Sequence, residues 1–310
     1  MDGHLRPVLV GVDGSYASTG AIRAGRVEAR RLGAPLRLVH VVPDYFPLAP
    51  VDPLTSEGLT EAGARLLAQA EAEARAEAPD LHVDTDLRRG GSATQLAAAV
   101  DDAAAAVLFV GRDEQALIDR VLLGSTAAGA AARATRPVVA VPAGWEPSGA
   151  RGEVVVAVKS PAHSSELLSD AFAAAEARGA RLVVLHSWKL LSAYEHILAS
   201  RVRNEDLVRR STTELESLLQ DWRVGYPDVE VEIRIVHDHP VHALVEASRS
   251  ADLLVLVRHG HDLPSGSLGS LGGTGRAVLR GAECPVRIVP PGGVPEVPGL
   301  VLESAGEAAK

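Results

Sequence analysis

Cysteine and aromatic residues are scarce in this 310-residue chain. The single cysteine, Cys284, excludes an intrachain disulfide and fits a reducing compartment. It stands before a proline and a Val/Ile run, and no His/Asn partner pattern accompanies it, so a buried apolar role is favoured over a reactive thiol. Phe, Trp and Tyr make up 3% of the chain, and its apolar residues are mainly Ala, Val and Leu.

A lysine- or arginine-rich block is also missing, and the formal net charge is −9. This charge disfavours nucleic acid or an anionic membrane surface as the main partner. No apolar run approaches the roughly 18 residues that a membrane-spanning helix needs. The first six residues lack the apolar core of a signal peptide. We therefore expect a cytoplasmic protein that binds neither nucleic acid nor membrane.

The chain contains an internal repeat. The run Val8–Asp13 reappears as Val154–Lys159, 146 positions later, and Leu36–His40 reappears as Leu182–His186 at the same offset. After the fourth apolar run the offset becomes 148, which indicates one two-residue insertion. The length suits two domains at roughly 150 residues each, and a hydrophobic content of 46% is enough for their cores.

Short Val/Leu runs alternate with Ala-rich amphipathic stretches in each copy. In the first copy we predict strands at 7–13, 36–42, 81–87, 106–111 and 137–142. We predict helices at 16–33, 57–78, 92–104 and 125–134. Continuous apolar strands between helices indicate a parallel sheet covered on both faces. The predicted fold class is therefore α/β, with two repeated doubly wound parallel-sheet domains.

The predicted domains span 1–143 and 153–290. The segment 144–152 is rich in Gly, Pro and Ser and is interpreted as a linker. The tail at 291–310 shows little pattern and is expected to be disordered.

Open parallel sheets bind ligands in the loops after strands near the point where the strand order reverses. Asp13 follows the first strand and can accept hydrogen bonds from ribose hydroxyls. Gly111, after the fourth strand, would let the backbone approach a ligand without a side-chain clash. Gly124, Ser125 and Thr126 stand at a helix start that suits phosphates. The same residue types also suit ordinary turns and N-caps, so spacing alone leaves both interpretations open.

Several motifs together resemble the universal stress protein family. They are the opening Val-Gly-Val-Asp-Gly-Ser, the strand that ends in His40-Val41, the Gly-x-x-Gly-x9-Gly-Ser pattern with its second glycine replaced, and the Cys-Pro-Val close of the second copy. The resemblance covers roughly residues 5–142 and 153–290. It implies strand order 3-2-1-4-5, dimerisation through the fifth strands, and ATP or AMP binding in some members. One chain would then form an intramolecular pseudo-dimer.

Carried over by position, the resemblance implies that Asp13 contacts ribose, that Val41 contacts adenine through its backbone, and that Val110 and Gly111 line the base and sugar site. The expected nucleotide-binding residues are Gly11, Val12, Asp13, Val41, Val110, Gly111, Arg112, Gly124, Ser125 and Thr126. The implied ligand is ATP or AMP, with Mg²⁺. Glu114 replaces the second glycine of the family pattern, and its carboxylate repels a triphosphate unless Mg²⁺ bridges the two. Arg112 would offset part of that repulsion.

The second copy departs further from the family pattern. Lys159 replaces the ribose-binding Asp, and Val257 replaces the first loop glycine. We expect this copy to be degenerate for ATP and to serve as a structural partner. An alternative is that Lys159, Arg258 and His259 form a cationic pocket for a different small anion.

Histidines gather in the second copy, at His237, His239 and His242 and again at His259 and His261. A His-x-His pair beside a carboxylate can bind zinc. The strands that precede the two groups are not neighbours in the expected order, and histidines in loops are commonly solvated. A metal site is therefore the less favoured interpretation.

Motifs of several enzyme classes are missing: a Gly-x-Ser-x-Gly turn, the Gly-Lys-Ser/Thr of a P-loop, and a Gly-x-Gly-x-x-Gly after the first strand. We expect a non-catalytic regulatory module of the stress response that binds adenine nucleotide mainly in its first copy. Two alternatives stay open: a nucleotide-free interaction scaffold, and a slow ATP hydrolase that uses Asp13 and Mg²⁺. Further association of two chains into a homodimer is also left open.

Overall fold

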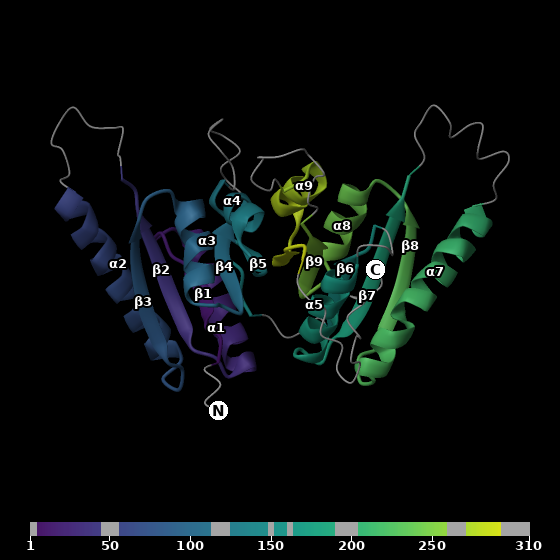
Figure 1. The fold of residues 1–310 in the computed structure, drawn as a ribbon, viewed down its shortest axis with the longest axis horizontal. Coiled ribbons are helices and arrows are strands. Elements are labelled where there is room, and N and C mark those ends of the chain that lie inside the picture. Colours follow the sequence, from purple (N-terminus) through teal and green to yellow (C-terminus); the bar gives the residue numbers. More distant parts are fainter. Residues whose placement is uncertain are drawn as a thin grey trace, which may run out of the picture.

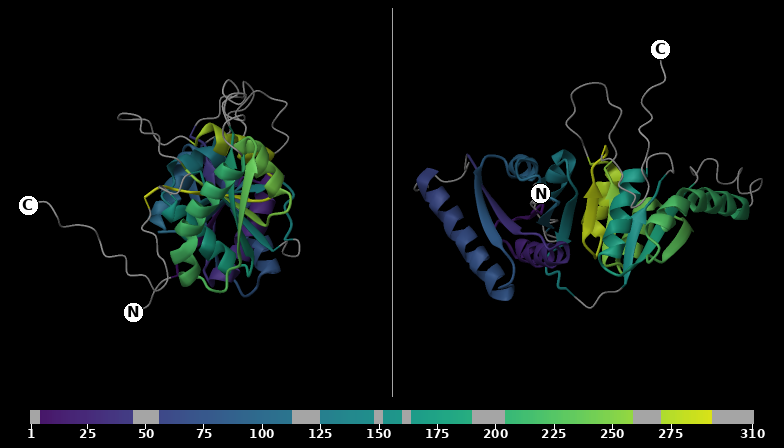
Figure 2. Two further views of the ribbon diagram at one scale, coloured as in Figure 1. Left: turned by 90° about the vertical axis from the view of Figure 1, so that its right-hand side faces the viewer. Right: turned by 60° about the horizontal axis from the view of Figure 1, so that its bottom comes forward.

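A computed structural model describes residues 5–44, 56–112, 125–147, 152–159, 164–189, 204–258 and 271–292. These residues form one ten-stranded sheet with helices on both of its faces (Figure 1). An N-terminal half (5–147) and a C-terminal half (152–292) repeat the same arrangement side by side. Helices α2 and α7 lie at the two outer ends of the molecule in Figure 1 and in the right-hand view of Figure 2.

The described elements of the two halves correspond one to one. The N-terminal half contains β1 (Val8–Gly11), α1 (Tyr16–Leu32), β2 (Leu36–Val42), α2 (Ser56–Glu77), β3 (Val83–Arg89), α3 (Ser92–Asp102), β4 (Val107–Arg112), α4 (Ser125–Arg133) and β5 (Val138–Pro142). The C-terminal half contains β6 (Glu153–Ala157), α5 (Ser165–Glu176), β7 (Arg181–Trp188), α7 (Asn204–Gly225), β8 (Val231–His237), α8 (Pro240–Ser248), β9 (Leu253–Val257), α9 (Gly273–Gly281) and β10 (Val286–Val289).

Two apolar layers cover the sheet because successive strand residues point to opposite faces. In β1, Val8 and Val10 belong to one layer and Leu9 to the other, and all three are fully buried. The first layer contains side chains of α1, α2, α5 and α7, and the second contains side chains of α3, α4, α8 and α9. Burial on both faces explains why these strands read as continuous Val/Leu runs.

The strand order confirms the predicted fold class. It is β3-β2-β1-β4-β5 in the N-terminal half, and the C-terminal half continues it as β10-β9-β6-β7-β8. Neighbouring strands are parallel within each half. At the junction β10 pairs antiparallel with β5, with Arg287 opposite Val139. The fifth strands therefore pair with each other, and each half covers the edge strand that the other would expose.

In the first copy the element bounds agree with the prediction to within two residues, and β3 is shifted at both of its ends. We predicted a strand from residue 81, but Leu81 lies in the turn after α2, where its N–H donates to the Ala78 carbonyl. The strand then extends two residues further than predicted, to Arg89. Its polar alternation follows from its place at the edge of the sheet, where Arg37 and Asp84 form an ion pair of 2.6 Å.

The segment that we interpret as a linker begins in contact with the first domain. Gly144 adopts a left-handed φ of 70°, and the Trp145 N–H donates to the Pro142 carbonyl at 3.1 Å. Trp145 packs against the core, and Glu146 forms an ion pair with Arg23 of α1. Residues 148–151 of the linker and 293–310 of the tail lie outside the described residues.

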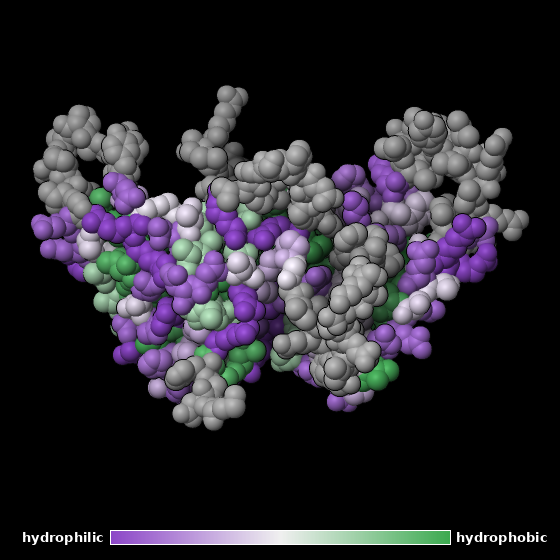
Figure 3. Space-filling model, viewed as in Figure 1, coloured by the Kyte–Doolittle hydropathy of each residue, from purple (hydrophilic) through white to green (hydrophobic). Residues whose placement is uncertain are grey.

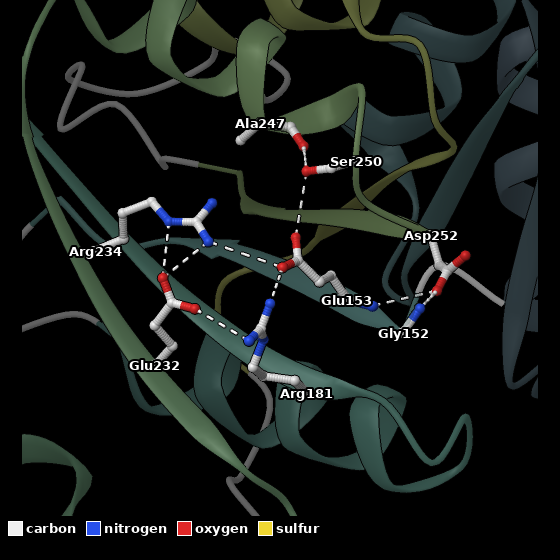
Figure 4. Close-up of polar contacts among 8 residues, drawn as sticks. All are labelled: Gly152, Glu153, Arg181, Glu232, Arg234, Ala247, Ser250 and Asp252. Carbon is white, nitrogen blue, oxygen red and sulfur yellow. Dashed lines mark hydrogen bonds and ion pairs between the residues drawn. The ribbon is translucent and has the colours of Figure 1, made fainter.

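A polar network holds the chain where it enters the C-terminal half (Figure 4). The Asp252 carboxylate accepts hydrogen bonds from the N–H groups of Gly152 (2.7 Å) and Glu153 (3.3 Å). The buried Glu153 carboxylate pairs in turn with Arg181 and, at 3.8 Å, with Arg234. Because Glu153 and Arg181 are the first residues of β6 and β7, this network lies at the amino ends of the strands, away from the edge where ligands bind.

The surface view shows where hydrophilic and hydrophobic residues lie on one face of the molecule. On the face shown in Figure 3, hydrophilic residues predominate over α2 and α7, and hydrophobic residues form separate small areas. Among the helices of the described residues, none is long and apolar enough to cross a membrane.

Candidate functional site

A small cavity lies at the carboxyl ends of β1 and β4, which are adjacent parallel strands at the point where the order of the N-terminal half reverses. We call it the N-terminal cavity, and its volume is about 240 Å³. Of the expected site residues, those that line it are Gly11, Val12, Asp13, Val41, Val110, Gly111, Arg112 and Thr126. Ser125 is the first residue of α4. Gly124 and Glu114 lie outside the described residues.

Asp13 is oriented by the turn that begins α1. Its Oδ1 accepts hydrogen bonds from the backbone N–H of Ser15 at 3.0 Å and from the Ser15 hydroxyl at 2.6 Å. Ser15 is the N-cap of α1, and its Oγ also accepts from the Ser18 N–H at 3.3 Å. The carboxylate is exposed at the cavity, and within the described residues both bonds that it accepts end on Oδ1. Asp13 therefore presents a positioned acceptor to a ligand.

Sequence reasoning missed several lining residues, of which His40, Ser92 and Leu96 are the clearest. The His40 Nδ1 lies 2.7 Å from the Val12 carbonyl oxygen, which ties the end of β2 to the end of β1. Ser92 is the first residue of α3, which starts at the same sheet edge after a Gly-Gly turn. Ser92 could have been predicted as a lining residue because it begins a helix directly after the third strand.

The structure corrects the reason given for glycine at position 111. A Cβ atom built there would lie 2.4 Å from the carbonyl carbon and oxygen of Ala17 and 2.8 Å from the Ser18 nitrogen. Both residues belong to the first turns of α1. Close packing of α1 on β4, rather than the approach of a ligand, therefore explains why position 111 has no side chain.

Arg112 and Arg258 occupy equivalent positions in the two copies, and both guanidinium groups bind the opposite half. Arg112 is buried and donates from Nη2 to the carbonyl of Ala282, the C-cap of α9. Arg258 donates from Nη1 to the carbonyls of Ala131 (2.7 Å) and Ala134 (3.0 Å), where α4 ends. The cation thus meets the negative end of a helix in each case. This differs from the expected roles, in which Arg112 offsets part of the repulsion from Glu114 and Arg258 lines an anion pocket.

The C-terminal half holds a larger cavity at the equivalent edge, with a volume of about 760 Å³. We call it the C-terminal cavity. Its lining residues are Ala157, Val158, Lys159, Leu185, Ser187, Trp188, Lys189, His239, Pro240, Leu244, Leu256, Val257, Thr274 and Gly275. Lys159 stands where Asp13 stands in the first copy. The His186 Nδ1 lies 2.9 Å from the Val158 carbonyl and so repeats the contact of His40 with Val12.

The clustered histidines of the second copy have separate contacts. His237 stacks on Trp188 with ring centroids 4.0 Å apart. His239 is the N-cap of α8 and accepts from the Val241 N–H at 3.4 Å. His242 pairs with Asp238, and this hydrogen bond raises the pKa of His242 and lowers the pKa of Asp238.

No group of three or more His, Cys, Asp or Glu side chains suited to a metal ion occurs among the described residues. His259 and His261 lie outside the part of the chain that the structure describes.

The chain matches the model of the universal stress protein family twice, over residues 4–142 and 151–290. It is 31% identical over 291 residues to a universal stress protein of Mycolicibacterium smegmatis, with 92% of this chain and 97% of that protein covered. A universal stress protein of Mycobacterium tuberculosis is 30% identical over 289 residues, with 90% of this chain and 95% of that protein covered.

Solved structures show the same fold. The crystal structure of a universal stress protein from Archaeoglobus fulgidus is 16% identical and superposes with a TM-score of 0.67, covering 93% of this chain and 97% of that one. A functionally unknown protein from Pseudomonas aeruginosa reaches a TM-score of 0.61 at 17% identity, with 93% of each chain covered. Two family matches, and relatives that share nearly the full length, establish that the chain belongs to the universal stress protein family, with two copies of the family's domain in tandem.

Proposed function

We propose that the N-terminal cavity binds an adenine nucleotide, ATP or AMP, and that the chain is a cytoplasmic, non-catalytic regulatory module of the stress response. The observation that carries the proposal is the exposed Asp13 carboxylate, held by Ser15 at the carboxyl end of β1 and facing a cavity at the switch point of the sheet. Carboxylate oxygens accept hydrogen bonds from both hydroxyls of a ribose. Family membership supports the same interpretation.

The remaining lining suits the parts of a nucleotide unequally. Val41 and Val110 bring apolar side chains and strand-end backbone to the cavity, which suits a base. Thr126 adds a hydroxyl in the first turn of α4, whose N-terminal end carries positive partial charge. A volume of 240 Å³ lies below the range of about 300–1,000 Å³ that is usual for small-molecule sites. The described cavity therefore suits a nucleoside better than a whole triphosphate.

Because ATP and AMP differ in charge, we expect them to differ in their need for Mg²⁺. Asp13 is anionic, and the guanidinium of Arg112, the cation that lines this cavity among the described residues, is bonded to Ala282 in the other half. Phosphates would therefore depend on the α4 N-terminus and, for ATP, on Mg²⁺ to offset the repulsion from carboxylates. We propose that ATP binding requires Mg²⁺ and that AMP binding depends on it much less.

Calorimetric titration tests this function. AMP and Mg²⁺-ATP should each bind near one site per chain, and Asp13→Ala should weaken both by roughly 10- to 100-fold, which is the range for a lost hydrogen bond to a charged group. The matched control is Lys159→Ala, which changes the equivalent position of the second copy and should leave nucleotide affinity unchanged. Equal affinity of Asp13→Ala and the parent would refute the assigned ribose site. No heat with millimolar nucleotide would favour the scaffold alternative, and steady release of phosphate would favour the hydrolase.

A further inference from the structure

We propose that the C-terminal cavity binds a small organic anion with an apolar ring, a ligand class different from the nucleotide proposed for the first copy. The cavity volume of about 760 Å³ lies within the range of about 300–1,000 Å³ of typical small-molecule sites. It lies at the carboxyl ends of β6, β7 and β9, the edge at which parallel sheets bind ligands.

Lysine usage points to this cavity. The chain has three lysines against 28 arginines, and two of the three, Lys159 and Lys189, line the cavity just after β6 and β7. Both side chains are exposed, and no Asp or Glu is among the described lining residues. The ammonium group is a compact point charge that pairs with carboxylates and phosphates. This lining therefore favours an anion in a chain whose net charge is −9.

Two helix ends add to the positive potential. Helices α8 and α9 begin at the same edge, and Pro240 and Thr274 from their first turns line the cavity. The N-terminal end of a helix carries positive partial charge that falls off within the first turn. The N-cap of α9 is Gly272, which has no side chain to cap the first N–H groups of the helix. The charged group of a ligand is therefore favoured near α9 and the two lysines.

The rest of the lining is apolar, and this defines the body of the ligand. Large apolar side chains come from β7, β9 and α8: Leu185, Trp188, Leu244, Leu256 and Val257. Trp188 is half-buried and stacks nearly parallel on His237, at an interplanar angle of 15°. This stack fixes the plane of an aromatic wall, against which a flat apolar ring can pack.

The same features disfavour a nucleotide in this cavity. Lys159 replaces the acceptor that Asp13 offers to ribose hydroxyls, and an ammonium group donates only. Val257 adds a branched side chain where the first copy has Gly111. The two copies therefore share a site position and differ in the chemistry that the site presents.

Titration with 2-naphthoate and with 2-naphthalenemethanol, its uncharged counterpart, tests the proposal on the full-length chain. Naphthoate should bind near one site per chain, and the alcohol should bind several-fold more weakly. The chain has three tryptophans, and only Trp188 lines this cavity, since Trp145 lies beside α1 and Trp222 lies in the core. Binding should therefore change tryptophan fluorescence in the parent and leave it unchanged in Trp188→Phe.

Substitution of the lysines tests the anion preference. Lys159→Gln and Lys189→Gln should each weaken naphthoate binding by roughly two- to fivefold, the range for an exposed charge pair, without changing the affinity for the alcohol. Arg65→Gln, which removes an exposed positive charge on α2, is the matched control. The lysines are exposed, so unchanged melting temperatures are expected for both variants.

Three outcomes would overturn the proposal: no saturable naphthoate binding, equal affinity for the acid and the alcohol, or displacement of naphthoate by AMP. Asp13→Ala separates this proposal from the function proposed for the first copy, because that variant should lose AMP binding and keep naphthoate binding.

Discussion

Position 13 of the first copy and position 159 of the second occupy the same point of the fold and carry opposite charges. The surrounding framework is the same, since His40 and His186 contact the carbonyls of Val12 and Val158 at 2.7 and 2.9 Å. A shared framework with a reversed charge supports our proposal that the two copies bind different ligands. The repeat in the sequence predicted this correspondence residue by residue.

The identity of Gly111 does not show whether the glycine serves ligand binding or helix packing. The sequence placed a glycine at a candidate ligand site, but the distance of 2.4 Å to Ala17 assigns it to helix packing. We predict that Gly111→Ala lowers the free energy of unfolding by about 1–3 kcal/mol, the usual cost of overpacking, as measured by chemical denaturation. Gly273→Ala is the control, because a Cβ there meets nothing within 4 Å. A Gly111→Ala protein of parental stability that has lost AMP binding would restore the ligand interpretation.

At the scale of elements, a buried ion cluster joins α1 to the C-terminal half. Glu28 of α1 accepts from Arg178, which follows α5, at 2.8 Å, and lies 3.5 Å from Arg287 of β10. Arg287 also pairs with Asp170 of α5 at 2.6 Å. The Glu28 side chain is only 6% exposed. Burial alone would raise the pKa of Glu28, but Arg178, Arg287 and Arg31 outweigh it and lower that pKa below the ordinary 4.5.

This cluster predicts an acid-sensitive junction. Because the folded-state pKa of Glu28 is lowered, its contribution to stability is complete above pH 4.5 and is lost as the pH falls further through the folded-state value. We predict that Glu28→Gln lowers the free energy of unfolding at pH 7 by about 3–5 kcal/mol, since it leaves the buried Arg178 guanidinium without its carboxylate partner.

Chemical denaturation of the parent and Glu28→Gln between neutral pH and pH 3 measures this prediction, and the variant should show a smaller loss of stability in acid. Glu61→Gln is the control, because it breaks an exposed pair on α2. Parental stability of Glu28→Gln, with the same dependence on pH, would contradict the assigned role.

Elements were predicted more reliably than contacts between them. Strands such as β1 and β4 are buried on both faces, so their apolar runs identify them, and the Ala-rich periodicity identifies α1 and α3. The start of β3 was misplaced because a lone apolar residue, Leu81, precedes the strand and lies in a turn. The pattern of apolar residues along the chain does not show whether Leu81 belongs to the strand or to the turn before it.

At the scale of the whole molecule, the two halves form one sheet with an approximate twofold relation. The antiparallel pairing of β5 with β10 and the reciprocal bonds of Arg112 and Arg258 to the ends of α9 and α4 follow that relation. Arg112 and its acceptor Ala282 are 170 positions apart. The sequence therefore located the arginine beside the site but could not show that its guanidinium group binds the other half.

We propose that the two copies keep one fold and hold two different ligands. Equilibrium dialysis of the full-length chain with labelled AMP, in the absence and presence of saturating 2-naphthoate, tests it most directly. We predict about one AMP per chain in both conditions, with unchanged affinity, because the two ligands occupy separate cavities. Two AMP molecules per chain, or displacement of AMP by naphthoate, would contradict the claim.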